Sequence, residues 1–292
     1  MSQISRLAAI AAAATLALSA HAAAPHADVV VLMDESGSMS GEQAWMRSVI
    51  PALDTGLIAE GLTDNRFGLV GFGASSATSP APSYLRSFSI GGAQMGSSAN
   101  WVTASNDLKV SGSIEDGWAA IDMAADYSLR ATAARNFILV TDEDRDNTNS
   151  TLNYSLVLQQ LKDAKILLNA VVNNTFRCGD GSAALGIIGS TGYKADGAGG
   201  FTTCTGAVAV GAGAIKTQYV DLALASGGGA WNLNILRSGG NNALSFSNAF
   251  LAGKIGEITT QPPAVPEPST YGLLAAGMVT VGWALRRRKQ QA

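Results

Sequence analysis

Residues 28–40, DVVVLMDESGSMS, decide the fold of this chain. The apolar run at residues 29–33 ends abruptly at Asp34, and a helical pattern begins at about Glu42. An uninterrupted apolar strand followed by a polar turn and a helix is typical of a central parallel strand that is buried on both faces. In such sheets, ligands bind in the crevice at the carboxyl ends of the strands. We therefore expect a binding site in the turn that begins at Asp34.

This turn contains one carboxylate and two hydroxyls at alternating positions, Asp34, Ser36 and Ser38. The spacing lets one tight loop aim its oxygen atoms at a common point, and Gly37 gives the backbone room to turn. An all-oxygen cluster suits a hard divalent cation such as Mg²⁺, which keeps waters and accepts few protein ligands. The motif, at the end of an apolar first strand, resembles the metal-ion-dependent adhesion site (MIDAS) of von Willebrand factor type A (VWA) domains.

Two further segments extend this resemblance. The loop at residues 111–117 and the Ala-rich helix after it are similar to the integrin β-subunit form of the site, in which a Glu supplies a ligand. By that comparison Glu115 is the preferred ligand, and Ser113 replaces it if the loop has a different register. Type A domains also place an Asp beside the cation after their fourth strand, where this chain has Asp142. The resemblance thus implies a site for Mg²⁺, or for Mn²⁺ or Ca²⁺, with the ligands Asp34, Ser36, Ser38, Glu115 and Asp142.

Strand and helix patterns alternate along the chain. After the first strand, we expect strands at residues 66–72, 84–90, 136–141, 166–172 and 231–236, and helices at 42–60, 101–108, from the 111–121 segment to about 130, 156–164, 215–225 and 242–258. Pro51 should kink or split the first helix. The alternation predicts an α/β fold, doubly wound, with a mostly parallel central sheet flanked by helices. The family fold is the same, so we expect one VWA domain over residues 27–260, with an insertion at 173–213.

Both termini have the pattern of targeting segments. Residues 1–24 resemble a signal peptide, because Arg6 precedes an apolar run at 7–18 and small residues follow. A linker at residues 261–270 contains Val265, Pro266, Glu267 and Pro268. An apolar run at 271–285 and a basic cluster at 286–289 follow, which predicts a C-terminal transmembrane helix within residues 271–292.

This three-part tail resembles the PEP-CTERM sorting signal of Gram-negative bacteria. The resemblance implies that an exosortase recognises the motif and cleaves the tail; a permanent single-span anchor is the alternative. We therefore expect an exported protein of the cell envelope, the cell surface or the extracellular matrix. Its association with the membrane through the C-terminal segment is transient if the tail is cleaved.

Charge and cysteine content narrow the range of partners. Without the two terminal segments, Lys and Arg fall from 19 to 14 and Asp and Glu from 22 to 21, so the net charge is about −7. Nucleic acids and anionic lipids demand cationic patches, so neither is an expected partner. Cys178 and Cys204 most simply form a disulfide in an exported protein, while free thiols or a metal site are the alternatives.

Several enzyme classes are excluded by the residues that the chain lacks. Its two histidines, His21 and His26, lie at or near the expected cleavage point, so the mature domain has no Ser-His-Asp triad and no His-ligated zinc. Asp34 with Glu115 or Asp142 resembles an acid/base carboxylate pair. Shared metal ligation accounts better for the hydroxyls between them.

A calcium loop of the EF-hand type also fails. Residues 142–147 begin like such a loop, but Asn147 stands where Gly is required and Asn153 where Glu is required. Asp144 and Asp146 could still support a second, neighbouring Ca²⁺ site.

The sequence therefore predicts a binding protein and not an enzyme. The expected function is an exported adhesion or protein-binding module, whose divalent cation binds an acidic residue of a partner protein. The alternative is a passive structural component of the extracellular matrix, in which the metal only stabilises the loop.

Overall fold

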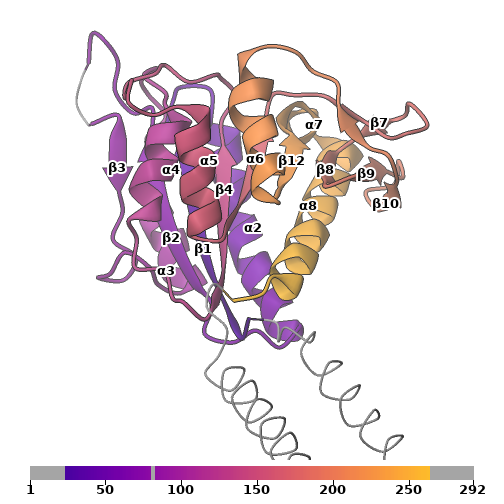
Figure 1. The fold of residues 1–292 in the computed structure, drawn as a ribbon, viewed down its shortest axis with the longest axis horizontal. Helices are drawn as coiled ribbons and strands as arrows, with labels where there is room; N and C mark the ends of the chain where they lie inside the picture. The colour runs from indigo at the N-terminus through magenta and orange to yellow at the C-terminus, as the bar shows by residue number, and fades with distance from the viewer. Residues whose placement is uncertain (1–23, 80–82, 264–292) are drawn as a thin grey trace, which may run out of the picture.

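The computed structural model describes residues 24–79 and 83–263 (Figure 1). Residues 1–23 of the predicted signal peptide, the sorting motif and the predicted transmembrane segment lie outside these residues. Among the described residues, no helix is long and apolar enough to cross a membrane.

A large mixed sheet forms the centre of the domain. Its strands are β1 (His26–Asp34), β2 (Arg66–Phe72), β3 (Leu85–Ser87), β4 (Ala133–Val140), β5 (Ile166–Val172), β8 (Gly186–Ile188), β9 (Thr191–Ala195), β10 (Phe201–Cys204) and β12 (Gly229–Asn232). They follow the order β10-β9-β8-β12-β5-β4-β1-β2-β3. The strands from β12 to β2 are parallel to one another, and those at both edges are antiparallel. The predicted fold class, a mostly parallel sheet flanked by helices, is confirmed.

Helices cover both faces of this sheet. They are α2 (Ser40–Ala59), α3 (Ser98–Ala104), α4 (Gly117–Ala125), α5 (Tyr154–Asp163), α6 (Asp221–Ser226), α7 (Leu233–Arg237) and α8 (Gly240–Thr260), with a 3₁₀ turn at Ser105–Asp107 and a π-helical turn at Lys216–Val220. One core lies between the sheet and α4, α5 and α6, which cover the near face in Figure 1. The other lies between the sheet and α2, α3, α7 and α8.

The apolar run of β1 is continuous because both of its faces are buried. Val30 and Leu32 belong to the core under α4, whereas Val29, Val31 and Met33 belong to the core under α2 and α8. All five side chains are inaccessible to solvent. β1 pairs with β2 on one side and β4 on the other, so its carboxyl end lies beside theirs at one edge of the sheet.

Some predicted boundaries were wrong. The strand predicted at 231–236 ends at Asn232, because the Asn232 side chain accepts a hydrogen bond from the Asn234 backbone N–H at 3.1 Å and caps α7. Pro51 does not split α2, which is one helix whose apolar face packs on the sheet. α4 ends at Ala125, five residues before the predicted end at Arg130.

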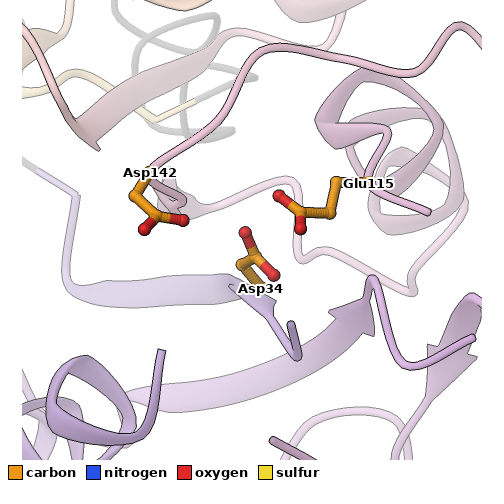
Figure 2. A group of neighbouring side chains, drawn as sticks. All are labelled: Asp34, Glu115 and Asp142. Carbon is orange, nitrogen blue, oxygen red and sulfur yellow. The ribbon is translucent and has the colours of Figure 1, made fainter. Parts of the chain in front are cut away.

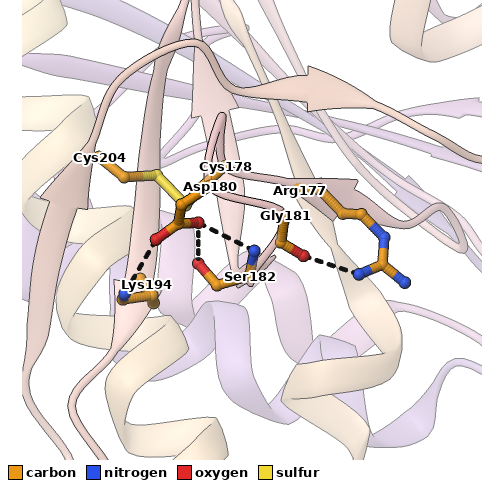
Figure 3. The surroundings of a disulfide bond; sticks show 7 residues. All are labelled: Arg177, Cys178, Asp180, Gly181, Ser182, Lys194 and Cys204. Atoms are coloured by element: carbon orange, nitrogen blue, oxygen red, sulfur yellow. Dashed lines mark hydrogen bonds and ion pairs between the residues drawn. A yellow bond between two sulfur atoms is a disulfide. The ribbon is translucent and has the colours of Figure 1, made fainter.

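The insertion is a β-rich extension of the sheet. β8, β9 and β10 add to the edge beyond β12, and a separate sheet contains β6 (Phe176–Arg177), β7 (Ala183–Ala184) and β11 (Val208–Ala209). The predicted disulfide is confirmed: Cys178 and Cys204 are bonded, with their Cα atoms 5.9 Å apart (Figure 3). It joins the small sheet to the edge strand β10. Next to it, Asp180 accepts two hydrogen bonds from Ser182, which close the turn between β6 and β7.

The two ends of the described domain meet at the amino ends of the parallel strands, on the side of the sheet opposite the carboxyl end of β1. The backbone N–H of Ala24 donates to the carbonyl of Gln261 at 3.4 Å. The Gln261 amide donates to the carbonyls of Arg135 and Lys165, at the starts of β4 and β5. The chain therefore enters and leaves the domain at the amino ends of the parallel strands.

Candidate metal centre

Carboxylates from three separate segments converge at the carboxyl ends of the parallel strands (Figure 2). Asp34 is the last residue of β1, Asp142 follows the adjacent strand β4, and Glu115 precedes α4. One carboxylate oxygen of each lies within 4.8 Å of the others. Asp34 and Asp142 come close together because β1, which ends at Asp34, and β4, which precedes Asp142, are parallel neighbours in the sheet. Among the described residues, these three carboxylates form the one cluster of acidic side chains that lie close enough together to share a metal ion.

The two serines of the motif lie in the same place. The Ser36 backbone N–H donates to Asp34 Oδ1 at 2.7 Å, which folds the turn back on the strand. Ser36 Oγ lies 3.3 Å from Ser38 Oγ, and Ser38 Oγ donates to Asp142 Oδ1 at 3.1 Å. The structure therefore brings together all five residues of the preferred set. Ser113, the substitute, is exposed, and its backbone N–H donates to the carbonyl of Ser75.

The centre concentrates negative charge in a buried place. Asp34 is inaccessible to solvent and Glu115 is 3% exposed. Burial and the adjacent Asp34 carboxylate raise the pKa of Glu115 to about 9, and burial also raises the pKa of Asp34. Glu115 Oε2 has no hydrogen-bond partner among the described residues. A buried carboxylate that lies beside a second one and keeps one oxygen without a partner fits a divalent cation, which would stabilise both charges.

Other side chains hold these acids in place. Thr141 Oγ1 donates to Asp34 Oδ2 at 2.7 Å, and the Gln43 amide donates to the Asp34 carbonyl at 3.2 Å. The Glu115 N–H donates to Asp146 Oδ2, and the Asp146 N–H donates to the Glu115 carbonyl, both at 2.6 Å. Asp146 therefore positions the Glu115 loop. We propose no second Ca²⁺ site here, because the Asp146 carboxylate already accepts a hydrogen bond from the Glu115 N–H and Asp144 is exposed.

The next residue along, Asp116, has a different role. It is the N-cap of α4 and accepts hydrogen bonds from the backbone N–H groups of Trp118 and Ala119. Arg145 donates to both of its oxygens, at 2.9 and 2.8 Å, and also stacks on the Trp118 ring. Asp116 therefore caps this end of α4. Glu115 is left free to face Asp34.

Two site residues were missed by the sequence reasoning. Gly73 follows β2, and a Cβ added there would lie 2.9 Å from Asp34 Oδ1 and 3.1 Å from Glu115 Cγ. Arg237, the last residue of α7, donates to Asp142 Oδ2 at 2.9 Å and to Glu42 Oε1 at 2.6 Å. A Gly directly after an apolar strand was a signal for the first. Nothing local signals Arg237, which is distant from the motif in sequence.

Replacing Gly73 by alanine is expected to weaken cation binding about tenfold or more, because the new methyl group displaces Asp34 and Glu115. Gly61→Ala is a matched control: its φ of +91° is close to the +93° of Gly73, but no atom lies within 4 Å of its added Cβ. Both variants should lose about 1 kcal/mol of stability through backbone strain. Calorimetric titration with Mn²⁺ should separate them, and equal affinities in the two variants would show that Gly73 does not shape the centre.

Comparison with known proteins identifies the sorting tail. Residues 264–289 match the PEP-CTERM protein-sorting motif, so this motif is present as predicted. It indicates export, sorting to the cell envelope of a Gram-negative bacterium, and recognition by an exosortase. No curated protein matches the chain.

Solved structures with similarity to the domain include two VWA proteins. One is a von Willebrand factor type A protein from Catenulispora acidiphila, with 20% identity and a TM-score of 0.36, over 50% of this chain and 33% of that one. The second is the SpRpn10 VWA domain, with 12% identity and a TM-score of 0.36, over 50% of this chain and 74% of that one. The chain thus matches about a third of the length of the first protein. It combines a mostly parallel α/β domain with a PEP-CTERM sorting motif.

Proposed function

We propose that this chain is a VWA-type adhesion module, exported to the cell envelope, that binds a protein partner through a divalent cation. The observation that supports this most directly is that Glu115, which has one buried oxygen without a hydrogen-bond partner, lies in a cluster with the carboxylates of Asp34 and Asp142. Such a cluster is unfavourable by itself and becomes favourable when a cation binds. The two serine hydroxyls add neutral oxygen ligands of the kind that Mg²⁺ accepts.

The proposed ligands are Asp34, Ser36, Ser38, Glu115 and Asp142. Mg²⁺ is the preferred cation, with Mn²⁺ and Ca²⁺ as alternatives, because all the donor atoms are oxygens. A hard cation held in this way supplies an electrophile that can take a carboxylate oxygen from a partner protein. The negative charge of Glu115 weakens that attraction relative to a site with a neutral ligand in its place.

A groove beside the centre offers a surface for the residues around that carboxylate. Its volume is about 370 Å³, and its lining residues are Ser38, Gly41, Glu42, Trp45, Leu236 and Arg237. Ser38 belongs to both the groove and the metal centre. Trp45 and Leu236 provide apolar contact area next to the Arg237 guanidinium. A partner segment with an acidic residue beside an apolar one therefore fits this groove.

The orientation of the domain suits a surface adhesin. The chain leaves the sheet at Gln261, at the amino ends of β4 and β5, shortly before the sorting motif. The metal centre lies at the opposite edge, at the carboxyl ends of β1 and β4. A domain attached through its C-terminal tail would therefore present the centre away from the point of attachment.

We further propose that the domain binds and does not catalyse. The acidic groups of the centre would serve as ligands, which removes them from use as a general acid or base. Carboxylate pairs in glycosidases need one group that is free to donate a proton.

A pull-down from the cell envelope tests the proposal. The purified protein should retain its partner in Mg²⁺ and lose it in EDTA, and Ser36→Ala should reduce both capture and cell cohesion while the domain stays folded. Equal capture with and without EDTA would contradict a metal-dependent contact. Unchanged cohesion in a folded Ser36→Ala strain would support the alternative of a passive matrix component.

Arg237→Ala is expected to raise the affinity for Mg²⁺ by about threefold to tenfold, because it removes a positive charge that contacts Asp142. The same variant should weaken binding of an acidic partner segment, since the groove loses its guanidinium. Arg177→Ala, which removes an equal charge from the insertion, serves as the control. Calorimetry measures the cation affinity, and an Arg237→Ala affinity at or below that of the control would contradict this role.

A further inference from the structure

A buried polar cluster joins α8 to the sheet, away from the metal centre. It consists of Lys254 and Glu257 on α8, Asn136 on β4 and Asn169 on β5. The side chain of Lys254 is inaccessible to solvent, that of Glu257 is 4% exposed, and both asparagines are fully buried. The surrounding core on this face of the sheet is apolar. A lysine in such a place is unusual, because burying an ammonium group is costly.

The contacts within this cluster are specific. Lys254 Nζ contacts Oδ1 of the Asn136 carboxamide. Glu257 Oε1 accepts a hydrogen bond from Lys254 Nζ at 2.8 Å and another from Asn136 Nδ2. One carboxylate oxygen therefore touches both the amine and the carboxamide nitrogen. An amine, a carbonyl group and a proton carrier therefore lie together in a buried site.

From this juxtaposition we infer that Lys254 and Asn136 form an intramolecular isopeptide bond, with Glu257 as the catalytic carboxyl group. Lys254 Nζ attacks Cγ of Asn136, a new C–N bond forms, and the bond between Cγ and Nδ2 breaks. One amine proton passes by way of Glu257 Oε1 to Nδ2, which leaves as ammonia. Amine and carboxamide become a secondary amide and ammonia, so the step needs no oxidant or cofactor.

The environment favours the reactive form of each group. Burial lowers the pKa of Lys254, and the charge of Glu257 offsets this only in part. A neutral amine is a nucleophile, whereas an ammonium ion is not. Contact between the reacting groups in the folded domain replaces a bimolecular encounter, which accounts for much of the acceleration in reactions of this kind.

Asn136 is a better acceptor than its neighbour Asn169. The Asn169 carbonyl oxygen already accepts hydrogen bonds from the Gly229 N–H at 3.2 Å and from the Trp231 indole at 3.5 Å. Its amide nitrogen donates to Glu257 Oε1 at 2.9 Å. Asn169 therefore orients Glu257, while Asn136 presents its carbonyl to the amine.

The bond would tie the last helix of the domain to the central sheet. α8 ends at Thr260, just before the segment that contains the sorting motif, and β4 pairs directly with β1. A pulling force at the C-terminal end would then pass from Lys254 into β4 through a covalent bond. α8 could not peel away from the sheet under such a load.

Mass spectrometry of the purified full chain, with its disulfide reduced, tests the inference. Trypsin should leave Lys254 uncleaved and yield the peptide 136–145 joined to a peptide that begins at Ser238. The joined species should be about 17 Da lighter than the sum of its two peptides, because one ammonia is lost. Separate peptides with cleavage at Lys254 in the wild-type protein would overturn the inference.

Two variants assign the roles. Glu257→Gln keeps the size of the side chain but cannot carry the proton, so its joined peptide should fall at least about tenfold in yield. Asn169→Ala should retain the link between Lys254 and Asn136. A Glu257→Gln protein that is linked as fully as the wild type would overturn the role of Glu257, and a link to Asn169 would overturn the choice of acceptor. The wild-type digest decides the main point even if a variant does not fold.

Discussion

Replacing Asp28 by asparagine is expected to lower the free energy of unfolding by about 3 kcal/mol, because it breaks a buried charge network. Asp28 is inaccessible to solvent and lies on β1, at the end of the sheet opposite the candidate metal centre. Arg66 donates to its carboxylate at 2.7 Å, and Arg130 donates at 2.6 Å from the side chain and from the backbone. An asparagine would turn an amide N–H group toward two guanidinium groups.

The pH dependence of the wild-type protein should follow from the same network. Burial by itself would raise the pKa of Asp28, but the hydrogen bonds from Arg66 and Arg130 outweigh it and bring this pKa below its ordinary value. A lowered folded-state pKa means that the unfolded chain binds the proton more readily. The stabilisation is therefore fully present above about pH 4 and is lost as the pH falls through the folded-state pKa.

Asp64→Asn provides the control, because Asp64 pairs with the same Arg130 at 2.7 Å but is 77% exposed. Its cost should be within about 0.5 kcal/mol of zero. Urea unfolding at pH 7 and pH 3 measures both variants. Equal stabilities for the two variants at pH 7 would show that burial of the Asp28 network contributes nothing.

Replacing Asp34 by asparagine is expected to reduce the affinity for divalent cations by about 100-fold or more, because the buried cluster loses a full charge. The folded domain without metal should not become less stable. Asparagine can still accept from Ser36 and contact Thr141, and the substitution removes the cost of burying the Asp34 carboxylate. A variant that loses the cation and keeps its unfolding temperature would separate function from folding.

Asp144→Asn is the matched control for this variant, since Asp144 lies in the loop after β4 but is exposed. Its cation affinity should change by no more than about threefold. Partner capture should fall with Asp34→Asn and persist with Asp144→Asn. Equal losses in the two variants would indicate a diffuse electrostatic effect and would contradict a defined centre.

Local sequence predicted the part of the site that is local in the chain. Asp34, Ser36 and Ser38 lie within one turn, so an apolar run followed by alternating oxygens was sufficient to find them. Glu115 and Asp142 were found only through the resemblance to VWA domains. Asp142 lies near Asp34 because β1 pairs with β4, and Glu115 is brought there by the loop before α4; no local pattern encodes either approach.

Residues that act across the fold could not be predicted in this way. Gly73 has no side chain, which leaves room for the carboxyl groups of Asp34 and Glu115, and these two residues come from other segments of the chain. Arg237 reaches Asp142 because α7 lies at the same edge of the sheet. Lys254 and Asn136 are 118 residues apart, and only the packing of α8 against the sheet brings them into contact.

The fold was predictable where the apolar pattern was long. β2 and β5 were predicted with their observed bounds, and the central sheet was predicted as mostly parallel. The segment 231–236 was misread because a strand and a helix share it, and the Asn232 cap divides them. The insertion could not be read, since its strands are short and are held by pairing and by the disulfide between Cys178 and Cys204.

Isothermal titration calorimetry tests the central claim most directly. The full chain, treated with chelator and then dialysed, is titrated with Mg²⁺ and with Mn²⁺ beside the Asp34→Asn variant. We predict saturable uptake of a single cation by the wild-type protein and none by the folded variant. The absence of any binding heat in the folded wild-type protein, or equal uptake by Asp34→Asn, would contradict the claim that these carboxylates form a metal centre.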